Sequence, residues 1–207
     1  MAEAQSEWEV PVDNQTKTVV KQEVKKKTKH VEKVDSADLP YLEGAVPEID
    51  GKVVFTLDRD VPGMNADSIY NRVYAYMEAL TRQPNQHDIS RIALVNKSRH
   101  IIAARMKEDL VFSSSFLSLD QTVFNYMLIA TCTDQHIHLT MDRLSYEYEM
   151  NRSTGFSDTA EELITDKKAL NKKRTKLVRG LAKFRRKTID RKNSIFEGIC
   201  KSLDIKY

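Results

Sequence analysis

The chain has 207 residues, of which 41% are hydrophobic and 30% charged, and its formal net charge is +3 at neutral pH. This length and composition suit one folded domain with extensions. No apolar run approaches the ~18 residues that a membrane-spanning helix needs. Two cysteines, Cys132 and Cys200, are too few for a disulfide framework or a four-thiolate zinc site, and we expect two unpaired thiols.

The charge is distributed unevenly along the chain. Residues 41–157 contain 11 Lys and Arg against 15 Asp and Glu, whereas residues 158–207 contain 15 against 7. Such asymmetry occurs in proteins with an anionic partner. It also arises when a basic element packs on an acidic one, and this second interpretation is the one we favour.

Residues 1–40 are predicted to form a flexible, lysine-rich tail. The stretch contains no glycine and only scattered valines among its lysines, without a persuasive periodicity. A segment of this kind buries too little apolar surface to offset the entropy lost on ordering.

A strand and a helix are predicted next. Val53, Phe55 and Leu57 alternate with polar residues, as in a strand with one buried face. Asn65 is a good N-cap for a helix over Ala66–Arg82. The apolar stripe of this helix consists of Ile69, Val73, Met77 and Leu80.

The following segments predict an antiparallel sheet. "RIALVN" and "HIIAARM" are separated by the polar "KSR", which indicates a hairpin. Further strand is predicted over residues 109–133, with an interruption near Ser118–Asp120. In "CTDQHIHLTMDRLSYEYE", the apolar positions change phase after Arg143. A phase change of one residue inside a strand predicts a β-bulge at Asp142–Arg143.

The same stretch contains two histidines, His136 and His138, which could chelate a metal from one face of a strand. A third ligand is hard to find, because Cys132 precedes the turn and the bulge displaces Asp142. Alternating polar residues are typical of a half-solvated strand. We therefore predict a strand and no metal site.

The C-terminal region, residues 151–207, is predicted to be one long helix over Ala160–Leu203. Asp158 or Thr159 is expected to cap it, and Glu162, three residues after Thr159, would complete a capping box. Leucines, isoleucines and Phe184 trace an apolar stripe. Its cations are the strongest candidate for a surface that binds an anion or a partner: Lys172, Lys173, Arg179, Lys183, Arg185, Arg186 and Lys187. The alternative, which we favour, is that they are the solvated face of a helix packed on an acidic sheet.

No catalytic or cofactor motif is present in the sequence. There is no P-loop, dinucleotide fingerprint, HExxH sequence, nucleophile elbow or EF-hand loop. Ser113–Ser115 lacks the glycine-rich elbow and any assignable His and Asp partners. We therefore expect no catalytic residues, no cofactor and no enzymatic activity.

Several motifs resemble a known family over about Tyr41 to Phe196. They are "YLEGAVPEIDGKVVF", "VPGMNADSIYNRV", "LVFSSSFLSLDQTVFNYMLIATC", "RLSYEYE" and "TAEELITDKKALNKKRTKLVRGLAKFRRKTID". In this order they resemble the domain of unknown function numbered 4468, which has a TATA-binding-protein-like (TBP-like) fold. The resemblance implies an α+β fold, with about five antiparallel strands and helices on one face. It agrees with a domain over residues 41–150 followed by the long basic C-terminal helix.

The family brings no established activity and no assigned catalytic residues. Its members are Bacteroidetes proteins that commonly carry export signals, so the resemblance implies the periplasm or cell envelope, with the cytoplasm as the alternative. The start "MAEAQ" is then interpreted as following a removed signal peptide.

Our leading hypothesis is a non-catalytic envelope module that binds a protein or a cell-surface component. The main alternative is a binder of nucleic acid or another polyanion through the basic helix, and a hydrolase of unrecognised type is the least favoured. Fold alone does not decide between them. Self-association through the C-terminal helix also stays open. An export signal upstream would nearly exclude nucleic acid.

Overall fold

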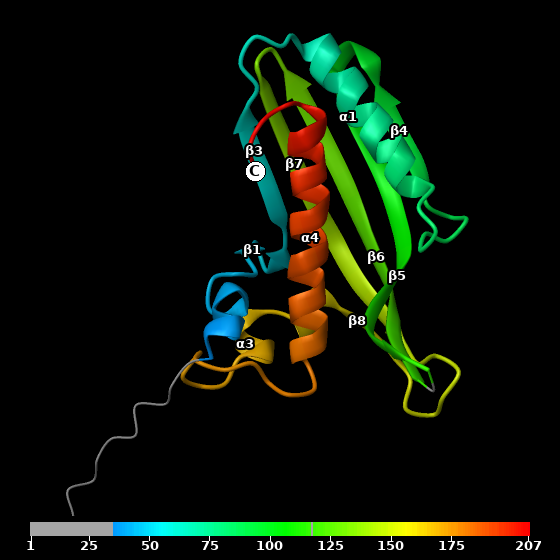
Figure 1. Ribbon diagram of the computed structural model, residues 1–207, viewed down its shortest axis with the longest axis vertical. Helices are drawn as coiled ribbons and strands as arrows, with labels where there is room; N and C mark the ends of the chain where they lie inside the picture. Colours follow the sequence, from blue (N-terminus) through cyan, green and yellow to red (C-terminus); the bar gives the residue numbers. More distant parts are fainter. Residues whose placement is uncertain (1–34, 117) are drawn as a thin grey trace, which may run out of the picture. The chain divides into compact units, whose positions relative to one another are not determined.

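The computed structural model describes residues 35–116 and 118–207 (Figure 1). Its strands are β1 (Glu48–Ile49), β2 (Lys52–Val53), β3 (Phe55–Asp60), β4 (Arg91–Asn96), β5 (Ile101–Ser115), β6 (Ser118–Thr133), β7 (His136–Tyr148) and β8 (Phe156–Thr159). Its helices are η1 (Ser36–Tyr41), α1 (Ala66–Thr81), η2 (Lys97–Arg99), α2 (Ala160–Leu163), α3 (Asp166–Ala169) and α4 (Ala182–Ser202). Residues 1–34 of the flexible tail predicted over residues 1–40 lie outside the described residues. Residues 36–40 belong to helix η1 instead.

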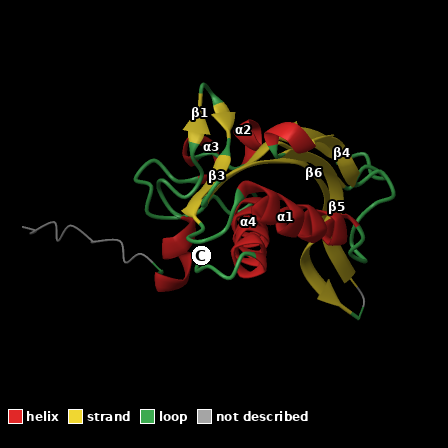
Figure 2. Ribbon diagram, turned by 90° about the horizontal axis from the view of Figure 1, so that it is seen from above, coloured by secondary structure: helices red, strands yellow, loops and turns green. Residues whose placement is uncertain are grey.

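An antiparallel sheet of six strands forms the body of the protein. Five strands follow the order β3-β7-β6-β5-β4, and β8 pairs with the second half of β7. The sheet curves around α1 and α4, which both lie on its concave face (Figure 2). The predicted α+β fold with helices on one face is confirmed, with one strand more than the five expected.

Helix α1 forms where the sequence predicts it. The Asn65 side chain accepts a hydrogen bond from the Ser68 amide and so caps the first turn. The predicted stripe of the helix is buried against the sheet, with Val73 and Met77 fully closed to solvent. The helix ends one residue earlier than expected, at Thr81.

The predicted β-bulge is present in β7. The pairing register between β6 and β7 shifts between Asn125 and Met127, opposite Asp142 and Ser145. Arg143 adopts a φ of 53°, a left-handed conformation that a bulge accommodates. The bulge lies between the part of β7 that pairs with β3 and the part that pairs with β8.

The prediction of one helix over Ala160–Leu203 is wrong, because helix α4 begins only at Ala182. The Asn171 side chain accepts hydrogen bonds from the amides of Thr175 and Lys176, at 2.9 and 3.3 Å. Arg174 has a left-handed φ of 56°. These local bonds from the asparagine side chain compete with the helical pattern and turn the chain back on itself.

Helix α4 packs along the concave face of the sheet. Phe184, Ile195 and Ile199 of its predicted stripe are buried, in one hydrophobic core with the sheet and α1. Within the described residues, no helix is long and apolar enough to cross a membrane.

Candidate functional site

Arg185, one of the seven candidate cations, lies fully inside the protein. Its guanidinium donates hydrogen bonds to the carbonyls of Tyr41, Leu42 and Ile164 at 2.6 to 2.7 Å. It also pairs with the Asp166 carboxylate at 2.6 Å, and its side chain is 0% exposed. Arg185 therefore joins η1 and the α2–α3 region to α4, and it is closed to any ligand in solvent.

Two further candidates are held by carboxylates of the protein. The Lys183 ammonium lies 2.9 Å from Asp120 Oδ2 and donates to the Tyr148 hydroxyl at 2.7 Å. Arg186 Nε donates to Asp38 Oδ1 at 3.0 Å. Both side chains contribute to local packing rather than to a free basic surface.

The other four candidates do not form one helical stripe. Lys172, Lys173 and Arg179 are exposed on the loop that precedes α4, whereas Lys187 is partly buried on the helix itself. Because the predicted helix is broken, its cations are divided between a loop and a packed helix. Of the seven candidate cations, the structure thus brings only the three on this loop to one exposed end of the protein.

A buried polar centre connects α4 with β5. Glu108 is 0% exposed, and Arg191 Nε and Nη2 donate to its two carboxylate oxygens at 2.7 and 2.6 Å. The Tyr126 hydroxyl and the side-chain amides of Asn85 and Gln86 also donate to Glu108. Burial raises the pKa of Tyr126 well above its usual range. A carboxylate with five donors is saturated, so this centre ties the helix to the sheet and has little capacity for a substrate.

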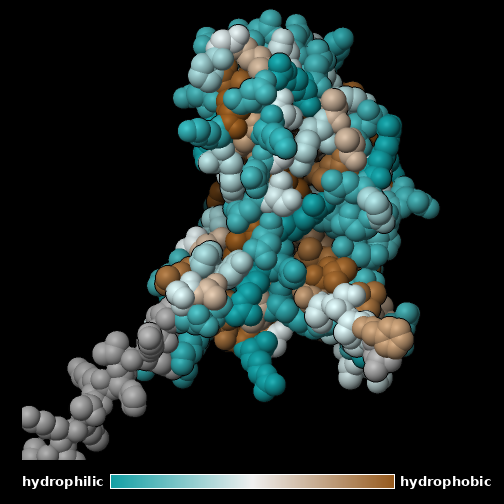
Figure 3. Space-filling view, in the orientation of Figure 1, coloured by the Kyte–Doolittle hydropathy of each residue, from teal (hydrophilic) through white to brown (hydrophobic). Residues whose placement is uncertain are grey.

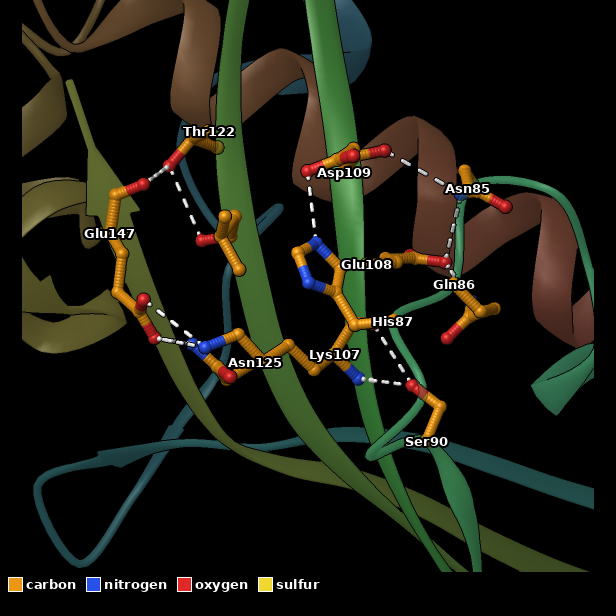
Figure 4. Close-up of polar contacts among 11 residues, drawn as sticks. Asn85, Gln86, His87, Ser90, Lys107, Glu108, Asp109, Thr122, Asn125 and Glu147 are labelled. Carbon is orange, nitrogen blue, oxygen red and sulfur yellow. Dashed lines mark hydrogen bonds and ion pairs between the residues drawn. The ribbon is translucent and has the colours of Figure 1, made fainter. Parts of the chain in front are cut away.

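Polar pairs cover the neighbouring positions of β5 (Figure 4). Lys107 and Asn125 both donate to Glu147 at 3.0 Å, and the hydrogen bond from Lys107 is the main reason that the Glu147 pKa is lowered. His87 Nε2 lies 3.1 Å from Asp109 Oδ1. Successive residues of a strand point to opposite faces, so these pairs lie on the face opposite Glu108.

His136 and His138 lie on β7, directly across from β3. His138 Nδ1 is 2.8 Å from Asp58, and His136 contacts both Asp58 and Asp60 at 3.1 Å. The hydrogen bond with His138 is the main reason that the pKa of Asp58 is lowered. In residues 35–116 and 118–207, no group of three or more His, Cys, Asp or Glu side chains is arranged to hold a metal ion.

A cavity of about 590 Å³ lies beside the β7 bulge, under the β1–β2 hairpin. Asp142 lines it, and its buried Oδ1 atom accepts no hydrogen bond from the described residues. Burial raises the pKa of this carboxyl. Cys132 and Cys200 are buried elsewhere, and both are free thiols in the structure.

The β5–β6 hairpin extends beyond the rest of the sheet as a two-stranded arm, which the structure describes over residues 110–116 and 118–121. On β6 the pairing with β7 stops at Thr122, and on β5 the last contact with the preceding loop is at Asp109. Figure 2 shows the end of the hairpin standing clear of the sheet. Its tip carries Phe116, which is 101% exposed, and Leu119, which is 58% exposed.

A groove of about 600 Å³ opens beside the base of the arm, between the start of α4 and the end of β7. We call it the aromatic groove. Its residues are Tyr148, Phe156, Arg179, Gly180, Leu181, Lys183 and Phe184. Figure 3 shows hydrophobic surface between the start of α4 and the hairpin, and again at the tip of the hairpin.

The arm and the aromatic groove are joined by direct contacts. The ring of Phe112, on the arm, packs edge-on against Phe184 with 4.7 Å between the ring centres. The Lys183 ammonium lies 4.1 Å from the centre of the Tyr148 ring while it pairs with Asp120 of the arm. The tip of the arm and the aromatic groove therefore belong to one surface, which we call the arm–groove face.

Sequence reasoning missed this face, although a signal for it was present. Residues 110–119, "LVFSSSFLSL", are ten consecutive residues without a charge. The apolar pattern predicts a strand. It does not show that the two edges of the arm have no further strand beside them.

A family model described as "Domain of unknown function (DUF4468) with TBP-like fold" matches residues 55–147. A crystal structure of a DUF4468 family protein from Bacteroides ovatus is 41% identical to this chain, covers 83% of it and 96% of its own chain, and superposes with a TM-score of 0.75. The chain belongs to the DUF4468 family.

A second solved structure supports the fold of this DUF4468 protein. A TBP-like protein from Parabacteroides distasonis is 18% identical, covers 78% of this chain and 99% of its own, and has a TM-score of 0.62. No protein with a curated description matches the chain. The suspected family is thus confirmed, and the family itself is one of unknown function.

Proposed function

We propose that this DUF4468 protein is a non-catalytic module that binds another protein through the arm–groove face. The observation that carries the proposal is the fully exposed Phe116 at the tip of the arm, within ten consecutive residues, 110–119, that carry no charge. Large apolar side chains that protrude next to an apolar groove are typical of protein-binding sites, because their burial in a complex is favourable.

The state of the polar residues supports binding rather than catalysis. Glu108 is saturated by donors, and the His136–His138 pair is engaged by exposed carboxylates. A general acid or base must reach the reacting group with a proton position free. The described histidines and Glu108 are arranged as structural pairs.

The nucleic-acid alternative has less support from the described residues. Arg185 is enclosed, and Lys183 and Arg186 are paired with Asp120 and Asp38. Binding to a phosphate backbone depends on cations that can release counterions from the polymer. The aromatic residues of the groove, moreover, pack edge-on or tilted against one another, and the Lys183 ammonium lies over the Tyr148 ring.

Location in the cell envelope is part of the same proposal and follows from the family resemblance. Fractionation of cells that make the protein should recover it with periplasmic or envelope markers. Recovery with cytoplasmic markers would contradict the location and would leave the binding proposal to be tested separately.

The binding proposal is tested by affinity capture with three forms of the chain. Wild type, Leu94→Ser and the double variant Phe116→Ser/Leu119→Ser are compared. Leu94 lies on β4 and is 58% exposed, the same fraction as Leu119, which makes it a matched control. We expect a protein, including other copies of this chain, to be retained by wild type and Leu94→Ser and lost from the double variant. Equal retention by all three forms would contradict the proposal, as would tight, salt-dependent binding of DNA.

A further inference from the structure

The outer part of the arm has little of the usual protection of exposed strands. Natural edge strands carry charges, prolines or bulges that prevent them from pairing with other chains. Residues 110–119 contain no charged residue and no proline. The register of β5 and β6 shifts only between Val111 and Ser113, and Ser113 to Ser115 pair regularly with Asp120 to Ser118. The outer half of the arm is therefore a regular edge that favours addition of another strand.

The dimensions of the arm match the position of the aromatic groove. Phe112 contacts Phe184 at the base, and Phe116 lies four residues further on, which is about 13 Å along a strand. When two equal arms lie antiparallel beside each other, the tip of each one reaches the base of the other. The base of each arm is the place where the aromatic groove opens.

One surface therefore carries both the protruding Phe116 and the aromatic groove, and such a surface can be complementary to itself across a two-fold axis. In such an interface both subunits use the same patch, and the protruding side chain of each subunit enters the groove of the other. The paired arms carry no charge in residues 110–119, so two copies do not repel each other there.

We infer that the partner of the arm–groove face is a second copy of this chain, with the two arms antiparallel and each Phe116 in the aromatic groove of the other copy. This inference rests on the proposed function and names its partner. It differs from self-association through the C-terminal helix, because α4 contributes only its first turn to the groove.

Sedimentation velocity of the full chain over a range of concentrations tests the inference. Wild type should change from monomer to dimer as the concentration rises. Phe116→Ser/Leu119→Ser should raise the dissociation constant about tenfold or more, as loss of central interface residues does. Leu94→Ser should leave it unchanged. Circular dichroism should show that the double variant is folded, since both side chains are exposed.

A second variant blocks the aromatic groove and leaves Phe116 unchanged. A Cβ atom added at Gly180 meets no atom within 4 Å, so Gly180→Phe can be accommodated by the folded chain while its ring fills the mouth of the groove. Gly180→Phe alone should weaken dimerisation as the arm variant does. A mixture of the two variant chains should form a heterodimer, because one intact arm then meets one intact groove.

The outcomes separate this inference from the proposed function. A wild-type chain that stays monomeric at all concentrations overturns the inference, even if cells yield a different protein that depends on Phe116. A dimer that Leu94→Ser weakens as much as the arm variant overturns it too, because the interface then lies elsewhere. Failure of the mixed variants to associate contradicts the reciprocal arrangement.

Discussion

Lys183 holds the arm to the body of the protein through Asp120, with 2.9 Å between the ammonium and the carboxylate. Burial alone would lower the pKa of Lys183, but the hydrogen bonds with Tyr148 and Asp120 outweigh it and raise the pKa. The cation lies on aromatic rings as well as beside a carboxylate. The base of the arm is therefore fixed, whereas its tip is exposed.

Lys183→Met should loosen the arm without unfolding the protein. Methionine retains the apolar contact with the rings but removes the ion pair, which for a partly exposed pair is worth about 1 kcal/mol or less. We expect faster amide hydrogen exchange in peptides from residues 110–121 of the monomer, with a melting temperature close to that of wild type. Unchanged exchange in the arm would show that Asp120 does not hold it.

Arg185→Met should destabilise the fold strongly. It leaves the Asp166 carboxylate and three carbonyl groups without their buried donor, and breaking a buried ion pair costs roughly 3–5 kcal/mol. Arg179→Met, at an exposed position, should change stability by less than about 0.5 kcal/mol. Chemical denaturation of both variants measures the difference. Similar stabilities for the two would contradict the structural role of Arg185.

Asp142 and Glu147 should affect the pH dependence of stability in opposite directions. The pKa of Asp142 is raised in the fold by burial, so its ionisation destabilises the protein as pH rises through the pKa of the unfolded chain. The pKa of Glu147 is lowered, chiefly by Lys107, so it stabilises the protein above its unfolded pKa and loses that effect as pH falls.

Melting temperatures between pH ~3 and pH ~7 measure this contrast. Relative to wild type, Asp142→Asn should become more stable as pH rises, and Glu147→Gln should become less stable. The same trend for both variants would contradict the environments described for the two carboxyls.

The two cysteines should be inert in the native protein. Burial raises the pKa of the Cys132 thiol to about 12, and burial also raises that of Cys200. Only the thiolate reacts with disulfide reagents. At pH 8 and without reductant, a thiol reagent should detect almost no thiol in the folded protein and two after denaturation. Rapid labelling of the native protein, or fewer than two thiols after denaturation, would contradict this assignment.

Local signals made much of the fold predictable. The Asn65 cap and the stripe through Val73 and Met77 specify α1, because capping and periodicity act within a few residues. The change of phase after Arg143 specifies the bulge in the same way.

The features that escaped prediction depend on contacts between distant parts of the chain. From the sequence, Arg185 is expected to be a surface cation, because arginine is rarely fully buried unless it is paired. Its partners at the end of η1 are more than 140 positions away in sequence, so the sequence does not reveal the pairing. The break before α4 depends on side-chain bonds from Asn171, which compete with an otherwise helical pattern. In the sequence, Phe116 resembles a core residue because it is a large apolar residue in an apolar stretch. The structure shows that it is exposed, because β7 ends before it reaches the tip of the arm.

Photo-crosslinking from position 116 tests directly whether the arm–groove face binds protein. A photoreactive phenylalanine analogue replaces Phe116 in cells that make the protein, and the same analogue at position 94 is the control. We expect covalent adducts with another protein molecule from position 116 and few from position 94. If that molecule is a second copy, the adducts should map to the peptide with residues 179–184. Adducts from position 116 that are no more abundant than those from position 94 would show that the arm–groove face does not bind protein.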